Sequence, residues 1–127
     1  MNDRPDAQNL LETARAALVA EILPALSGAP RYTALMIANA MAIALREMAA
    51  GDAPLHAESG RLRALLPELA QAPPGAPLRE TLTGYNRRLI EAIRGGRFDT
   101  AERGALLDHL RRTTEAKLAV SNPKMLK

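Results

Sequence analysis

The sequence has no cysteine and very few aromatic residues. Its 127 residues include two tyrosines, one phenylalanine and no tryptophan. The absence of cysteine excludes disulfides, thiolate nucleophiles and every cysteine-based metal site. It also favours a reducing cytoplasm over secretion, because small secreted domains usually carry disulfides. With so few aromatic residues, the core must consist mainly of alanine, leucine, isoleucine and methionine.

Strand-forming residues are also scarce, since valine occurs only twice. A β-sheet is therefore not expected. The N-terminal residues are acidic and polar, unlike the basic and then apolar start of a signal peptide. Hydrophobic residues make up 47% of the chain, enough for one core at this length. We expect a single domain over residues 1–127, located in the cytoplasm and with no membrane-spanning segment.

Proline and glycine divide the chain into about five helices. The expected helices cover about residues 5–26, 31–50, 54–66, 78–94 and 100–120. Residues 71–77 contain three prolines and predict an extended connection. Residues 121–127 predict a short basic tail.

The helix expected over 31–50 is the most apolar part of the chain. Between Ala34 and Leu45 its only polar residue is Asn39. A helix that is apolar on every side is typically buried, and its unbroken apolar part of about 12 residues is shorter than the roughly 20 that a bilayer requires. We therefore predict an all-α, antiparallel bundle of about five helices with this helix at its centre.

The same helix supplies three candidate site residues. Asn39 at its middle is either a ligand contact, a residue that sets the register of a dimer, or an amide bonded to a neighbouring helix. Arg46 and Glu47 near its end form either an ion-pair network that fixes helix packing or part of a functional site. The sequence does not choose between these alternatives.

No catalytic or metal-binding constellation is recognisable. The two histidines, His56 and His109, belong to no compact ligand motif and are predicted to lie at the surface. No serine has the strand-turn-helix context of a nucleophile, and no glycine-rich loop follows a strand. We expect no metal, no cofactor and no catalytic residue, although an enzymatic role stays open.

Basic residues are concentrated in the second half of the chain, and the net charge is +3. If the last two helices pack antiparallel, four arginines converge into a candidate anion site: Arg87, Arg94, Arg111 and Arg112. The alternative is a solvated surface, because neighbouring acidic residues can neutralise these arginines. The net charge is low for a nucleic-acid-binding protein.

Six short segments resemble a small bacterial family of unknown function. They are Arg4-Pro5, Asn9-Leu10-Leu11, Glu21-Ile22-Leu23-Pro24, Arg31-Tyr32, Ile37-Ala38-Asn39-Ala40 and Arg46-Glu47-Met48. The resemblance covers about residues 4–51 and returns only as a helix pattern in 77–118. Members of that family occur alone, fused to or beside aminoglycoside-phosphotransferase-like kinases, often near acyl-CoA dehydrogenases. The resemblance implies association with such a system and supplies no catalytic residues.

Three functions follow as expectations. The first is a non-enzymatic accessory or interaction module associated with a phosphotransferase-like kinase or an acyl-CoA dehydrogenase. The second is a binding protein or small enzyme for an acyl or acyl-CoA ligand, with a pocket near Asn39, Arg46 and Glu47. The third is a weak nucleic-acid binder that uses its C-terminal helices. A homodimer through the first two helices is also expected, because one small bundle has too few helices to cover the apolar helix.

Overall fold

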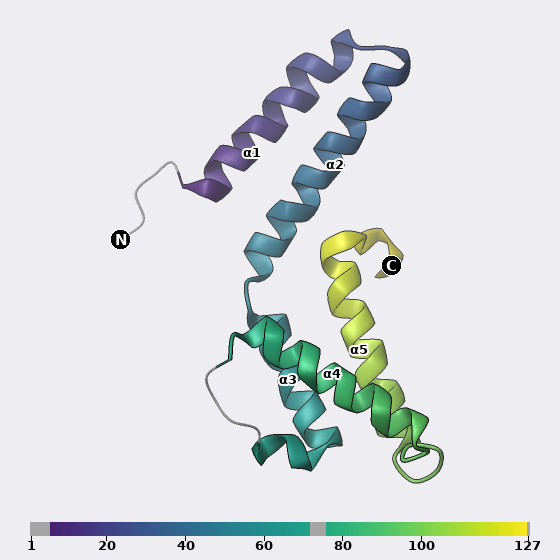
Figure 1. Cartoon of the computed structure of the whole chain (residues 1–127). Coiled ribbons are helices and arrows are strands. Elements are labelled where there is room, and N and C mark those ends of the chain that lie inside the picture. Colours follow the sequence, from purple (N-terminus) through teal and green to yellow (C-terminus); the bar gives the residue numbers. More distant parts are fainter. Residues whose placement is uncertain (1–5, 72–75, 127) are drawn as a thin grey trace. The chain divides into compact units, whose positions relative to one another are not determined.

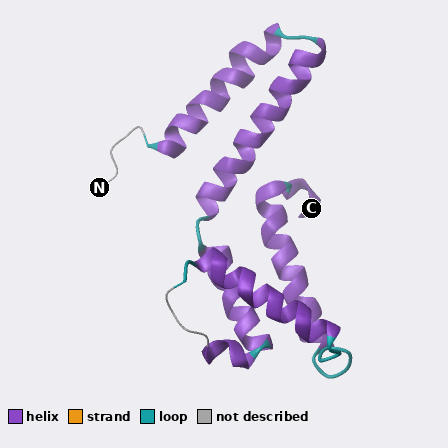
Figure 2. Ribbon diagram, in the orientation of Figure 1, coloured by secondary structure: helices purple, strands orange, loops and turns teal. Residues whose placement is uncertain are grey.

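The computed structural model describes residues 6–71 and 76–126. Within these residues the chain forms five α-helices and no strand (Figure 2). They are α1 (Ala7–Ala17), α2 (Gly28–Ala50), α3 (Ala53–Leu65), α4 (Leu78–Arg94) and α5 (Arg103–Ser121) (Figure 1). The predicted all-α class is confirmed.

Two short 3-10 helices lie next to the connection and the tail expected from the sequence. Pro67–Gln71 forms a 3-10 helix, so the connection begins later than residue 71, and residues 72–75 lie outside the described residues. The last helix extends to Ser121, and Pro123–Leu126 forms another 3-10 turn within the expected basic tail. Residue 127 also lies outside the described part.

The chain divides into two compact units. The first consists of Met1–Gly51 with Ala119–Lys127, and the second consists of Asp52–Leu118. The last residues of α5 thus belong to the first unit. The organisation of residues 1–127 as a single domain stays a prediction.

The first unit is built on a hairpin of α1 and α2, which run side by side in opposite directions (Figure 1). Asp6 caps α1, because its carboxylate accepts a hydrogen bond of 2.8 Å from the backbone N–H of Asn9. A π-helical turn, Leu18–Ile22, and a 3-10 turn, Leu23–Ala25, follow α1. Gly51 ends α2 with a positive φ of 60°, a conformation that suits glycine.

Two arginines fasten the hairpin through backbone carbonyls. Arg15 of α1 donates from Nε to the carbonyl oxygen of Ala38 in α2 at 3.0 Å. Arg31 of α2 donates to the carbonyl of Leu23 in the turn, also at 3.0 Å. Both bonds run from a charged side chain to a backbone carbonyl.

The expected burial of the second helix is wrong, although the helix itself is confirmed. Only Ala34 and Ala38 of α2 are buried. Large apolar side chains on its other sides are about half exposed, including Tyr32 at 66%, Met36 at 50% and Ile37 at 46%. Because α1 is the main helical neighbour of α2, the Ala34–Ala38 side is covered best, and residues 41–46 are half-buried.

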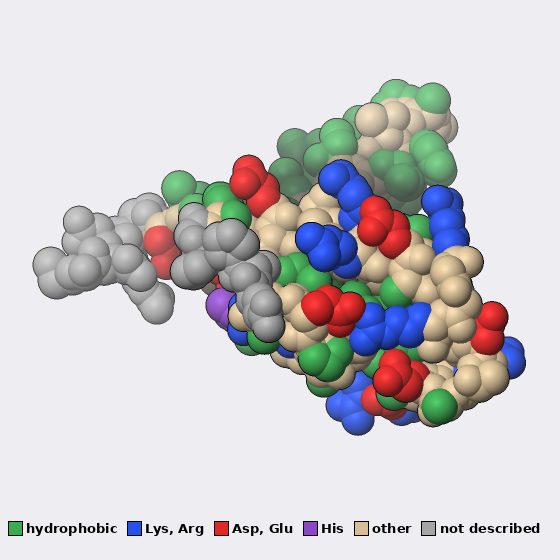
Figure 3. All heavy atoms as spheres, turned by 60° about the horizontal axis from the view of Figure 1, so that its bottom comes forward, with side chains coloured by type: hydrophobic (Ala, Val, Ile, Leu, Met, Phe, Trp, Pro, Cys, Tyr) green, Lys and Arg blue, Asp and Glu red, His purple; other side chains and the backbone are tan. Residues whose placement is uncertain are grey.

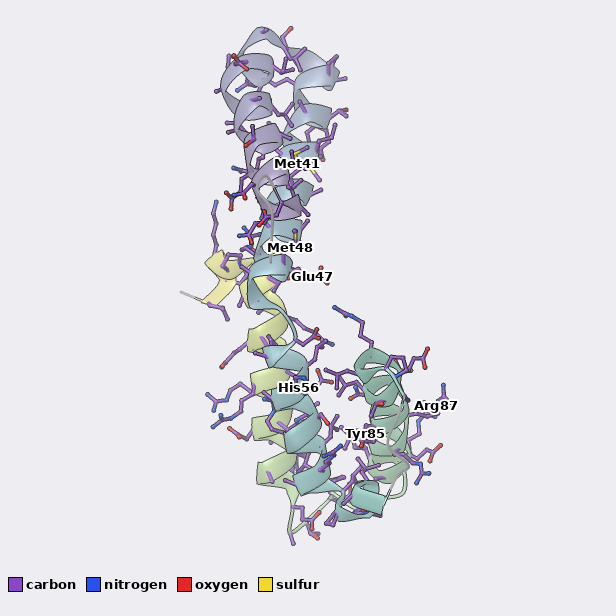
Figure 4. The ribbon with its side chains drawn as sticks, turned by 90° about the vertical axis from the view of Figure 1, so that its left-hand side faces the viewer. Met41, Glu47, Met48, His56, Tyr85 and Arg87 are labelled. Carbon is purple, nitrogen blue, oxygen red and sulfur yellow. The ribbon has the colours of Figure 1, made fainter. Side chains whose placement is uncertain are left out.

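The second unit contains the larger hydrophobic core. Leucines of α3 and of the 3-10 helix that follows it pack with residues of α4, with Phe98 and with the start of α5. The buried cluster comprises Leu62, Leu65, Leu66, Leu69, Leu82, Tyr85, Leu89, Phe98 and Leu106. Tyr85 points from α4 toward α3, whereas Arg87 lies on the outer side of α4 (Figure 4).

Candidate interaction surface

Two apolar stripes of α2 remain exposed beside the side that packs on α1. Residues three and four apart share a helix face, and the buried Ala34 and Ala38 identify the face toward α1. We call one remaining set the Ile37 stripe; it consists of Ile37, Met41, Ala44 and Met48. We call the other the Asn39 stripe; it consists of Tyr32, Leu35, Met36, Asn39 and Ile43. Figure 4 labels Met41 and Met48 along the helix.

The Ile37 stripe is apolar throughout. Ile37 and Met48 are 46% and 42% exposed, and Met41 and Ala44 between them are half-buried. Soluble proteins rarely leave large contiguous apolar surfaces in water, and such surfaces commonly mark interaction sites. The stripe is therefore a candidate surface for a partner.

Asn39 is exposed on α2, in contrast to the buried position expected from the sequence. Among the described residues, the structure gives its side chain no hydrogen-bond partner. A pairing with a neighbouring helix is therefore not seen among the described residues, and contact with a ligand or with another chain stays a prediction.

Arg46 contacts the end of α5 within the first unit. It is half-buried, and its Nε donates to the carbonyl oxygen of Val120 at 2.7 Å. The last carbonyls of a helix have no partner within the helix, so Arg46 satisfies one of those at the end of α5. Glu47 is exposed beside it (Figure 4). Neither residue lines either of the two described pockets.

The second unit holds a polar cluster that sequence reasoning missed. His109, predicted at the surface, is only 3% exposed. Arg61 of α3 donates from Nε to His109 Nδ1 at 3.1 Å and from a terminal nitrogen to Thr113 Oγ1 at 3.1 Å. Because Nδ1 accepts this bond, the neutral ring carries its proton on Nε2. Nearby, buried Glu58 accepts a bond of 3.0 Å from Asn86.

Burial lowers the pKa of His109 below its ordinary value, and the positive charge of Arg61 lowers it further. The acidic groups of Glu58 and Asp108 oppose this shift. The histidine lines a pocket of about 220 Å³ together with Arg61, Ala64, Leu65, Ala105 and Asp108. Typical ligand pockets have about 300–1,000 Å³, so this one is small for an organic ligand.

We expect the second unit to lose stability as the pH falls below about 6.5, the ordinary pKa of histidine. The folded-state pKa of His109 is lowered, so the unfolded chain takes up the proton first. The stability that neutral His109 contributes is fully present above the pKa of the histidine in the unfolded chain. It is lost as the pH falls toward the lower pKa of His109 in the folded protein. Replacing His109 with glutamine, which can still accept from Arg61, removes that loss.

The measurement is the midpoint of urea unfolding of the wild type and of His109→Gln, at about pH 7.5 and about pH 5.5. Histidine titrates between these two values. The wild-type midpoint should fall more than that of His109→Gln. An equal fall of the urea midpoint in both proteins would show that His109 does not cause the pH dependence.

The four candidate anion-binding arginines lie on two helices, α4 and α5. The main neighbour of α4, which carries Arg87 and Arg94, is α3. On α5, Arg111 and Arg112 each bond Asp108 at 2.9 Å. Hydrogen bonds from Arg111 and then from Arg112 lower the pKa of Asp108. Basic and acidic side chains are interleaved on the face shown in Figure 3, so anion binding by these arginines stays a prediction.

A second pocket, of about 360 Å³, also lies in the second unit. It is lined by Leu66, Glu68, Arg88, Glu91, Ala92, Gly95 and Arg97. Arg97 and Glu68 are paired at 2.6 Å, so its charges are balanced. Within residues 6–71 and 76–126, no three His, Cys, Asp or Glu residues form a group that can hold a metal ion.

By length and composition, α2 is one helix of the described chain that can cross a membrane. A helix that packs inside a water-soluble protein can have the same composition, and little of α2 is covered here.

The fold thus defines a helical protein of two compact units with an exposed apolar helix in the first. The chain belongs to DUF6285, a domain family of unknown function, which matches residues 24–125. The match includes the second unit, where the resemblance noted in the sequence was expected only as a helix pattern. It begins after two of the segments that carried the resemblance, Arg4-Pro5 and Asn9-Leu10-Leu11. No curated protein and no solved structure is detectably similar to the chain.

Proposed function

We propose that this protein is a non-enzymatic interaction module of the cytoplasm, which binds a phosphotransferase-like kinase or an acyl-CoA dehydrogenase through the Ile37 stripe. The observation that carries the proposal is the exposure of this stripe on a helix without charged residues between Arg31 and Arg46. Covering apolar surface contributes about 25 cal/mol per Å², so a partner that covers the stripe gains binding energy without having to desolvate a charge.

The choice of partner rests on the sequence resemblance, which implies a kinase and dehydrogenase system acting on acyl substrates. The pockets support the alternative of an acyl-CoA ligand less well. Their volumes of about 220 and 360 Å³ lie below and near the lower end of the range of about 300–1,000 Å³ for ligand sites.

Co-expression with an aminoglycoside-phosphotransferase-like kinase and an acyl-CoA dehydrogenase from the same genome tests the proposal. We expect the wild-type protein to retain one of them through affinity purification, and we expect Ile37→Glu to lose it, because the new carboxylate would have to be desolvated in the interface. The matched control is Ile90→Glu in α4, where the exposed fraction is 49% against 46% at Ile37.

The control variant should retain the partner as the wild type does. If neither enzyme is retained by the wild-type protein, or if both variants behave alike, the proposal is wrong. Stabilisation of the protein by acyl-CoA in a thermal melt would instead support the ligand-binding alternative.

A further inference from the structure

Asn39 is a single amide in the middle of an otherwise apolar exposed stripe. Leu35 and Ile43 lie four residues before and after it, and Tyr32 and Met36 extend the stripe toward the start of α2. Tyr32, Leu35 and Met36 are 66%, 44% and 50% exposed, and Ile43 is half-buried. An occupant of this stripe must bury apolar side chains and also satisfy one carboxamide.

A carboxamide restricts the choice of occupant. It offers two N–H donors and a carbonyl acceptor, so its best matched partner is a second carboxamide in the reverse orientation. Lipid chains offer no such partner, and a buried amide without one costs free energy. A second copy of this chain brings a matching amide to the same place by symmetry.

We infer that the Asn39 stripe is the contact of a two-fold symmetric dimer, with the two Asn39 side chains paired at the axis. The equal spacing of Leu35 and Ile43 about Asn39 then brings Leu35 of each copy against Ile43 of the other in an antiparallel pair of α2 helices. A single asparagine in an apolar helix seam is a known means of fixing register and the number of chains. This contact uses a different side of α2 from the Ile37 stripe.

Sedimentation equilibrium of the full chain at tens of micromolar tests the dimer. We expect a species of twice 13.7 kDa. The variant Asn39→Asp places two carboxylates at the axis, and we expect it to raise the dimer dissociation constant by at least about tenfold, because like charges in an interface repel. The matched control, Thr33→Asp, adds the same charge to an exposed position of α2 outside both stripes and should leave the constant within about twofold.

A second variant distinguishes self-pairing from pairing with a different molecule. Asn39→Ala removes both amides of a symmetric pair at once, so no polar group is left unsatisfied and the dimer should persist within about threefold of the wild-type constant. With any other partner, the same change would leave the partner's polar group unpaired and weaken the complex.

A monomer at these concentrations, or a dimer indifferent to Asn39→Asp, overturns the inference. Flotation of the wild-type chain with phosphatidylcholine–phosphatidylglycerol vesicles, abolished by Met36→Glu, would also overturn it in favour of a membrane surface. The proposed function is tested separately, since Asn39→Asp should still retain the enzyme partner through the Ile37 stripe.

Discussion

Replacing Leu62 with alanine is expected to lower the free energy of unfolding of the second unit by about 2–5 kcal/mol, the usual cost of truncating a buried leucine. Leu62 is completely buried, with 0% of its surface exposed, and belongs to the cluster that joins α3 to α4. The neighbouring Leu66 is also nearly inaccessible at 1%. Two such side chains hold α3 in place, so the cavity left by truncation cannot fill easily.

The measurement is urea denaturation followed by tyrosine fluorescence. Tyr85 is buried in this core and Tyr32 is exposed in the other unit, and there is no tryptophan to mask them. The control is Leu107→Ala on α5, where the side chain is 55% exposed and the expected loss is below about 0.5 kcal/mol. If both substitutions cost the same, the core does not lie where the structure places it.

The sequence was most informative where apolar periodicity and helix-ending residues agree. The predicted limits of the fourth helix match α4, because Pro77 precedes it, Gly95 follows it, and Leu82, Tyr85 and Leu89 repeat at helical spacing. The last helix lacks such a clear start. It was expected from about residue 100, and it begins at Arg103.

Composition alone did not reveal what covers an apolar helix. The apolar composition of α2 shows that other helices can pack on each of its sides. It does not show how many helices do so. Among the described residues of the first unit, α1 is the main helical neighbour of α2, and Asn39 lies at the surface rather than in a core.

The buried histidine was missed for a different reason. On the last helix Leu106 and His109 are the buried residues, whereas Leu107 and Leu110 are 55% and 42% exposed. The partner that makes burial of this ring tolerable is Arg61, 48 residues earlier in the chain. A polar contact between distant segments leaves no local pattern from which to predict it.

Replacing Ala38 with lysine is expected to destabilise the hairpin of the first unit by about 3 kcal/mol or more, the cost of an uncompensated buried charge. Ala38 is only 4% exposed, and its carbonyl already accepts a hydrogen bond from Arg15. The new ammonium would therefore be forced between two helices and next to the like charge of Arg15.

Ala40→Lys is the matched control, because Ala40 lies two residues along the same helix and is exposed. Alanine and lysine have similar helix propensities, so the two variants differ mainly in burial. Thermal melts followed by circular dichroism should show a lower midpoint for Ala38→Lys and a nearly unchanged one for Ala40→Lys. Equal midpoints would mean that α1 does not cover the Ala34–Ala38 side of α2, and both stripes defined on α2 would then have to be reassigned.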